Sequence, residues 1–198
     1  MSHLIHAFAF DSDEVMELWA RYGEAVSEPS PEVGPGHRTI MLHEFHYLGP
    51  DGLPERHRTV HVIKALVDDL RTYPYLFDTD QVEVTVERGG TASELYRRED
   101  GLWGVDILLH RPLRRGETAS FEYLTKFKYV EPPAPEFRRQ ALRRVENMEL
   151  LVQFHRRKLP ARVRWASWES REGALLEGKT LLPHGRVCRR WIACGECD

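Results

Sequence analysis

Three histidines near the first predicted hairpin are the residues whose types and spacing could bind a metal ion. They are His43 on one side of the sequence GPDGLP, and His57 and His61 on the other. Pro and Gly in a short connection are typical of a hairpin turn. Neutral imidazoles held on a rigid sheet bind zinc and other borderline divalent ions. Residues 39–48 and 56–67 are therefore predicted to be two paired strands that present these imidazoles.

The pairing register decides whether the histidines meet. If Leu48 pairs near Arg56, His43 lies opposite His61 and Tyr47 lies opposite His57, all on one face. A shift of one residue would separate them. The other face of this predicted hairpin is the expected core side, with Ile40, Leu42, Val60, Val62 and Leu66. The alternative to a metal site is an outer face with ordinary solvated histidines.

A second candidate metal site lies at the carboxyl end, where His184, Cys188, Cys194 and Cys197 supply four potential ligands within fourteen residues. The CGEC sequence has the two-residue gap of zinc knuckles, and a closed site of this kind would be structural rather than catalytic. The alternative is a flexible tail with free thiols. Zinc is thus the cofactor that the two candidate sites suggest, and neither pattern establishes it.

Basic residues are frequent in the second half of the chain. Residues 1–110 hold 9 Lys and Arg against 20 Asp and Glu, a net charge of −11, whereas residues 111–198 hold 19 against 11, a net charge of +8. A basic surface of this size could contact nucleic acid phosphates. However, Arg162 and Arg164 alternate with Val163 and Trp165, as on the solvated face of a strand, and the acidic half would repel a polyanion. We do not expect direct nucleic acid binding.

Sequence signatures of catalysis are missing. The chain has no GxSxG, no phosphate-binding glycine loop, no dinucleotide fingerprint and no HExxH. A catalytic group assembled only by folding leaves no such signature. A non-enzymatic role is therefore the prediction, and an enzyme or metal-binding protein that uses the histidines is the alternative.

The elements that would position these residues are mostly strands. One amphipathic helix is predicted near the start, where Val15, Trp19, Tyr22 and Val26 recur at helical spacing, and the linker SEPSPEVGPG follows it. From residue 37 onward the period is two, with short strands separated by turns, and only EFRRQALRR suggests one or two helical turns. We predict a mainly β fold, an antiparallel β-sandwich of about nine or ten strands, with residues 1–36 as helix and linker, 37–193 as the sandwich and 194–198 as a cysteine-containing tail.

Composition favours a folded protein in a reducing compartment. Hydrophobic residues make up 41% of the 198 residues, which is enough to form a core. The first residues lack a basic leader and a cleavage site, no segment has the roughly 18 apolar residues of a spanning helix, and three clustered cysteines do not form a disulfide framework. We expect a cytoplasmic protein with no membrane association.

Three stretches carry a resemblance to a known family: GLWGVDILLHRPLRRGETASFEY, PAPEFRRQALRRVENMELLVQFH and LPARVRWASWES. Together they resemble the β-rich domain that follows the helix-turn-helix in uncharacterised actinobacterial regulators of the XRE type. The resemblance covers about residues 38–185. Its most distinctive run is the series Phe154, His155, Leu159, Pro160, Trp165 and Trp168.

This resemblance implies an accessory role, in regulation, ligand sensing or protein docking. The predicted amino-terminal helix and linker replace the family's helix-turn-helix, and CRRWIACGECD departs from its final aromatic strand. The partner would be a protein or a small molecule, and a homodimer formed through the amino-terminal helix is one arrangement. Candidate binding residues are Tyr47, Arg164, Trp165 and Trp168. The two tryptophans are three apart in a strand, so one is expected in the core and the other outside it.

Overall fold

The computed structural model describes residues 3–9, 36–129, 136–141, 145–168, 175–181 and 187–193. These ranges contain fourteen β-strands and no helix, so the chain is mainly β as predicted. The strand number is larger than the predicted nine or ten. The predicted amino-terminal helix, most of its linker and the tail at 194–198 lie outside the described residues. Within the described ranges, no helix is long and apolar enough to cross a membrane.

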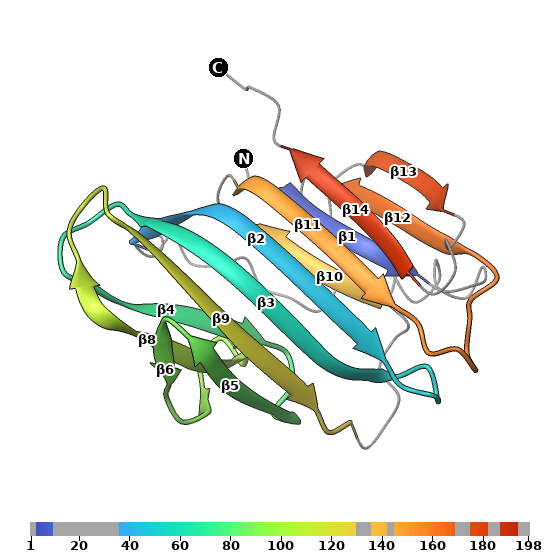
Figure 1. Cartoon of the computed structure of the whole chain (residues 1–198), viewed down its shortest axis with the longest axis horizontal. Coiled ribbons are helices and arrows are strands. Elements are labelled where there is room, and N and C mark those ends of the chain that lie inside the picture. Colours follow the sequence, from blue (N-terminus) through green and yellow to red (C-terminus); the bar gives the residue numbers. More distant parts are fainter. Residues whose placement is uncertain are drawn as a thin grey trace.

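A six-stranded sheet forms the centre of the molecule and runs across the view in Figure 1. We call it the central sheet. All its neighbouring strands are antiparallel except β11 and β2, which run parallel. Its strands, in spatial order, are β14 (Val187–Ala193), β11 (Val145–Gln153), β2 (His37–Leu48), β3 (Pro54–Ala65), β9 (Thr118–Phe127) and β5 (Val82–Arg88).

A second sheet packs on the inner face of β3 and β9 (Figure 1). It has the order β4 (Leu70–Phe77), β8 (Trp103–Leu113) and β6 (Gly90–Ala92), and β7 (Tyr96–Arg97) also pairs with β8. The residues between these sheets are mostly aromatic, and we call them the aromatic core. Its buried members are Ile63, Tyr73, Tyr75, Ile107, Phe121 and Tyr123.

A third sheet has the order β10 (Glu136–Ala141), β1 (His3–Ala9), β12 (Val163–Trp168) and β13 (Leu175–Leu181). It covers the inner face of β11 and β2 through an aliphatic core. That core consists of Leu42, Leu48, Met148, Leu150, Val152, Phe154, Val163 and Trp165. The helical turns predicted in EFRRQALRR are wrong, because this segment begins with strand β10, which pairs with β1.

The register of the β2–β3 hairpin differs by one residue from the predicted one. His46 pairs with His57 and Tyr47 with Arg56, while Leu48 pairs with Pro54. Because side chains alternate between faces, this shift places the even-numbered side chains of β2, such as Leu42, on the same face as the odd-numbered side chains of β3, such as His61. Polar side chains of both strands therefore point inward. The buried residues of this face are His37, Leu42, Glu44, His46, Leu48, His57, Thr59, His61, Ile63 and Ala65. The predicted core residues Val60 and Val62 are only half-buried on the outer face.

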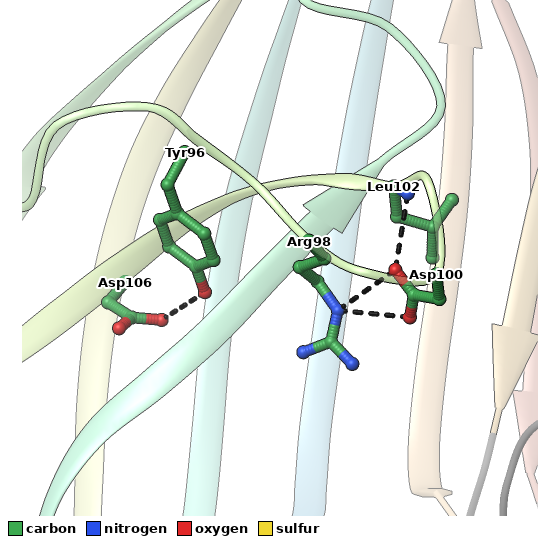
Figure 2. Close-up of polar contacts among 5 residues, drawn as sticks. All are labelled: Tyr96, Arg98, Asp100, Leu102 and Asp106. Atoms are coloured by element: carbon green, nitrogen blue, oxygen red, sulfur yellow. Dashed lines mark hydrogen bonds and ion pairs between the residues drawn. The ribbon is translucent and has the colours of Figure 1, made fainter.

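The turn between β7 and β8 is held by side chains, as Figure 2 shows. The amide of Leu102 and the Arg98 Nε both donate to the carboxylate of Asp100, at 3.0–3.2 Å. The Tyr96 hydroxyl donates to Asp106 Oδ1 at 2.8 Å. Burial, followed by this bond to Asp106, raises the pKa of Tyr96. The bond ties β7 to β8 across the second sheet.

Candidate functional site

Three buried side chains at the centre of the hairpin converge on one point. Glu44 and His46 lie two residues apart on β2 and therefore share its inner face, and His57 lies opposite His46 on β3. One potential ligand atom from each of the three lies within 4.8 Å of the other two. All three residues are buried. We call them the Glu44 group.

The carboxylate of Glu44 is the centre of this group. His46 Nε2 lies 3.6 Å from Glu44 Oε2, and His57 Nε2 lies 3.9 Å from Glu44 Oε1. The Thr59 hydroxyl lies 3.1 Å from His57 Nε2 and fixes the orientation of that ring. A buried carboxylate is costly unless it is paired, so its position between two imidazoles offsets part of the desolvation penalty.

These distances are close to those of a metal site. Two ligand atoms at roughly 2.0–2.1 Å from a tetrahedral zinc ion lie about 3.4 Å apart. The observed separations of 3.6 and 3.9 Å involve the two different oxygens of Glu44, and one ligand atom from each of the three residues lies within 4.8 Å of the others, so the side chains would move closer together around one ion. Two imidazoles and one carboxylate suit zinc and related divalent transition ions. The residues present therefore fit such an ion.

Ring orientation is the feature that would have to change on binding. His46 and His57 are stacked, with ring centroids 4.0 Å apart and an interplanar angle of 20°. The nitrogen lone pairs of the two rings therefore lie in nearly parallel planes, whereas two ligands of one ion must point at a common position. Binding would thus splay the rings and release His57 Nε2 from the Thr59 hydroxyl.

The structure does not assemble the predicted cluster of His43, His57 and His61. His43 is on the outer face, where its Nδ1 lies 3.8 Å from the Glu149 carboxylate. His61 is buried on the inner face, but its Nε2 lies 2.9 Å from the Thr39 hydroxyl and its ring contacts Tyr73 edge-on. Only His57 belongs to the Glu44 group. The predicted cluster is wrong because its register was shifted by one residue.

The second predicted metal site falls largely outside the described residues. This applies to His184, Cys194 and Cys197. Cys188 lies in β14 and pairs with Val152 of β11, although its side chain is not described. Zinc binding at the carboxyl end thus stays a prediction.

The candidate partner-binding residues have different positions. Trp165 is 3% exposed and belongs to the aliphatic core, so it does not offer a surface to a partner. Trp168 and Arg164 lie in the same strand β12, and their side chains are outside the described set. Tyr47 lies on the outer face at the end of β2, with the Arg56 guanidinium 4.4 Å above its ring.

A small pocket opens beside Tyr47. It has a volume of about 150 Å³ and is formed where β2 ends, β3 begins and β11 ends. We call it the Arg56 pocket. Its lining residues are Tyr47, Leu48, Glu55, Arg56, Gln153, Phe154 and His155.

Sequence reasoning missed Glu44 and His46. Both residues alternate with the aromatic residues Phe45 and Tyr47. The same alternating pattern is produced whether the polar side chains of a strand point inward or outward, so the pattern does not show which face is buried. The usable signal was the spacing Glu-x-His, which places both side chains on one face. This spacing predicts a site only when it is combined with the pairing register that places His57 opposite His46.

Comparisons with known proteins leave the identity of the chain open. No family model matches it, and its sequence matches no curated protein. One similar solved structure is a "putative protease" from Parabacteroides distasonis, with 11% identity and a TM-score of 0.43 over 84% of this chain and 37% of that one. Another is an M1 zinc metallopeptidase from Deinococcus radiodurans, with 14% identity and a TM-score of 0.37 over 75% of this chain and 39% of that one. This chain thus spans under two fifths of either protein, and with TM-scores below 0.5 neither likeness bears on its fold or activity.

Proposed function

We propose that this chain is a non-catalytic β-sandwich accessory domain that takes up one divalent transition-metal ion, zinc in the first place, at the Glu44 group. The observation that carries the proposal is the convergence of two imidazoles and one carboxylate within 4.8 Å in the interior. Such an ion would join β2 to β3 where the hairpin has polar rather than apolar contacts. Occupancy would then control the stability of the domain.

The electrostatics of the interior favour this reading. The Glu44 carboxylate is 2% exposed and lies between two imidazoles, so a cation bound beside it would be attracted strongly in the weakly polar interior. A divalent ion would offset the carboxylate charge and would take the two imidazoles as neutral ligands. Metal binding of this kind also stabilises the folded state, because the unfolded chain lacks the assembled site.

Burial argues against catalysis at this site. Two histidines and one glutamate leave a position for water or substrate in catalytic zinc enzymes. Here, however, all three side chains are buried within the inner layer of the central sheet. The Arg56 pocket is lined by the neighbours Tyr47 and Arg56 and not by His46 or His57. A metal-dependent regulatory role also agrees with the resemblance to XRE-type accessory domains.

The proposal is tested by zinc-dependent thermal stability. We use a variant with all three cysteines changed to serine, so that the carboxyl end does not bind the ion. Zinc at 100 times its Kd should stabilise the fold by about 2.7 kcal/mol, which is a rise in Tm of roughly 5–11 °C for a chain of this size. His46→Gln and His57→Gln should each abolish most of this rise.

The matched control is His110→Gln, which removes an exposed histidine from β8. It should leave the zinc-dependent rise unchanged. Apo melting curves show whether each variant folds. If the cysteine-free chain gains no stability from zinc, or if His110→Gln reduces the gain as much as His46→Gln, the proposal is wrong.

A further inference from the structure

The Arg56 pocket combines opposite charges with an apolar floor. Leu48 and Phe154 are buried members of the aliphatic core, so the floor is held by the fold. Glu55 and Arg56 are exposed residues on the rim. Among the described residues, no ion pair joins either charge to another side chain. Both charges are therefore available to a ligand.

A β-bulge brings the two charges to the same opening. Tyr47 pairs with Arg56 and Leu48 with Pro54, so Glu55 is an extra residue in β3. In a regular strand, adjacent side chains point to opposite faces, whereas a bulge redirects one of them. The result is that both Glu55 and Arg56 line one pocket.

Arg56 is also held in place. Its guanidinium lies 4.4 Å above the ring of Tyr47, an arrangement that favours a planar stacked group and leaves the edge N–H donors for an anion. On the β11 side, His155 Nδ1 accepts a hydrogen bond from the Arg157 amide at 3.2 Å, which fixes its ring at the rim. Arg56 is thus a preorganised cation at the rim of the pocket, with the fixed ring of His155 on the other side.

Size limits the ligand. The volume of about 150 Å³ is smaller than the usual sites of cofactors and drug-sized molecules. A ligand must therefore be small, and the adjacent acid and base favour one that carries both charges on neighbouring atoms.

We propose that the Arg56 pocket binds a free α-amino acid with an apolar side chain. Its carboxylate accepts hydrogen bonds from Arg56, its ammonium group donates to Glu55, and its side chain packs against Leu48 and Phe154. The site is separate from the Glu44 group and goes beyond metal binding. It would make the domain a sensor of a small zwitterion.

The test is isothermal titration calorimetry of the full chain with three probes of similar shape. L-Leucine carries both charges, 4-methylpentanoate lacks the amine and 3-methylbutylamine lacks the carboxylate. We expect saturable binding of leucine with one site, and at least about tenfold weaker binding of each analogue, since each lacks one charge-assisted contact. EDTA in the buffer makes the result independent of any metal at the Glu44 group.

Two variants assign the charges. Arg56→Met and Glu55→Gln should each weaken leucine binding about tenfold. Arg56→Met should not weaken 3-methylbutylamine further, and Glu55→Gln should not weaken 4-methylpentanoate further. The matched controls are Arg97→Met, which removes an arginine stacked on Trp103 elsewhere, and Glu94→Gln, which removes an exposed acid. Both should leave leucine binding unchanged.

The proposal is overturned if leucine shows no saturable binding, or if either analogue binds the natural chain as tightly as leucine. It is also overturned if the control variants weaken leucine as much as Arg56→Met and Glu55→Gln do. Should Arg56→Met fail to fold, the comparison of the three probes on the natural chain still decides the outcome.

Discussion

At the scale of single residues, the unusual feature is an acid placed in the interior beside two histidines. Glu44 has no aqueous exposure to offset its charge, and its nearest charged or polar neighbours include His46 and His57. Such groups are stable inside a protein only when each polar atom is satisfied. One metal ion could take a ligand atom from each of the three side chains, and the proposed function rests on this convergence.

The predicted histidine cluster lay in the right region of the chain but shared only His57 with the Glu44 group. The sequence drew attention to His57 because three histidines flank one turn, and it missed Glu44 and His46 because the apolar residues Val60 and Val62 seemed to mark the core face. The face is decided by strand register, and bulges at Ile40 and Glu55 alter it at both ends of the hairpin. Local periodicity does not reveal such bulges.

A prediction at this scale concerns two tyrosines with raised pKa values. Tyr96→Phe removes the bond to Asp106 and should cost about 1 kcal/mol at pH 7. Because the folded-state pKa of Tyr96 is raised, its contribution is complete below the unfolded value of about 10 and falls as pH rises through the folded value. Urea unfolding of the natural chain and of Tyr96→Phe at about pH 7, 9 and 11 measures how this stability difference changes with pH.

Tyr129 provides the matched control. Burial and the nearby Asp78 charge raise its pKa to about 12, and no hydrogen bond contributes to the shift. Tyr129→Phe should therefore change stability little at pH 7 and make the protein relatively more stable than the natural chain above about pH 10. Equal losses for both variants at pH 7, or pH-independent differences, would show that the Asp106 bond is not the cause.

At the scale of elements, two segments show why sequence patterns mislead. β4 was not predicted, because Pro74 interrupts the run in which Tyr73 and Tyr75 face the aromatic core. Proline is tolerated there because β4 is an edge strand of the second sheet. The segment that contains β10 was predicted to form one or two helical turns, yet it pairs with β1 as a strand, because such pairing outweighs weak helix propensity.

Gly89 lies where the chain passes from strand β5 of the central sheet to strand β6 of the second sheet. It lies between β5 and β6 with φ of 86°, and an added Cβ would lie 2.3 Å from the Ser120 carbonyl oxygen and 2.8 Å from Phe121 Cα. Gly89→Ala should combine backbone strain with this steric conflict and destabilise the fold by about 3 kcal/mol or more. Chemical denaturation measures the loss.

Gly101 is the control for strain alone. Its φ is 84°, and nothing lies within 4 Å of an added Cβ. Gly101→Ala should therefore cost only about 1–2 kcal/mol. If both substitutions cost the same, close packing at the β5–β6 crossing contributes nothing.

At the scale of the whole molecule, one sheet supports two cores. The inner face of the central sheet carries the aliphatic core under the third sheet and the aromatic core under the second sheet, and β2 and β3 lie side by side between them. The Glu44 group lies on these two strands. A substitution that destabilises one core should therefore lower the stability of the other core as well.

Phe121→Ala tests this coupling. Phe121 is fully buried in the aromatic core, so its truncation should cost about 3–5 kcal/mol and lower Tm by roughly 6–20 °C. The loss should appear equally in circular dichroism and in tryptophan fluorescence, to which Trp165 of the aliphatic core contributes. The control Leu108→Ala removes a half-exposed side chain and should cost about 0.5 kcal/mol or less. Separate transitions for the two probes would mean that the cores unfold independently.

The most direct test of the central claim is the anomalous scattering of zinc in crystals of the zinc-loaded chain with its cysteines intact. We predict one strong peak inside the β2–β3 hairpin, at roughly 2.0–2.2 Å from a nitrogen of His46, a nitrogen of His57 and a carboxylate oxygen of Glu44, with the two rings splayed from their stacked arrangement. A peak only at the carboxyl-terminal cysteines, or no peak, would contradict the assignment of this interior group as a metal site.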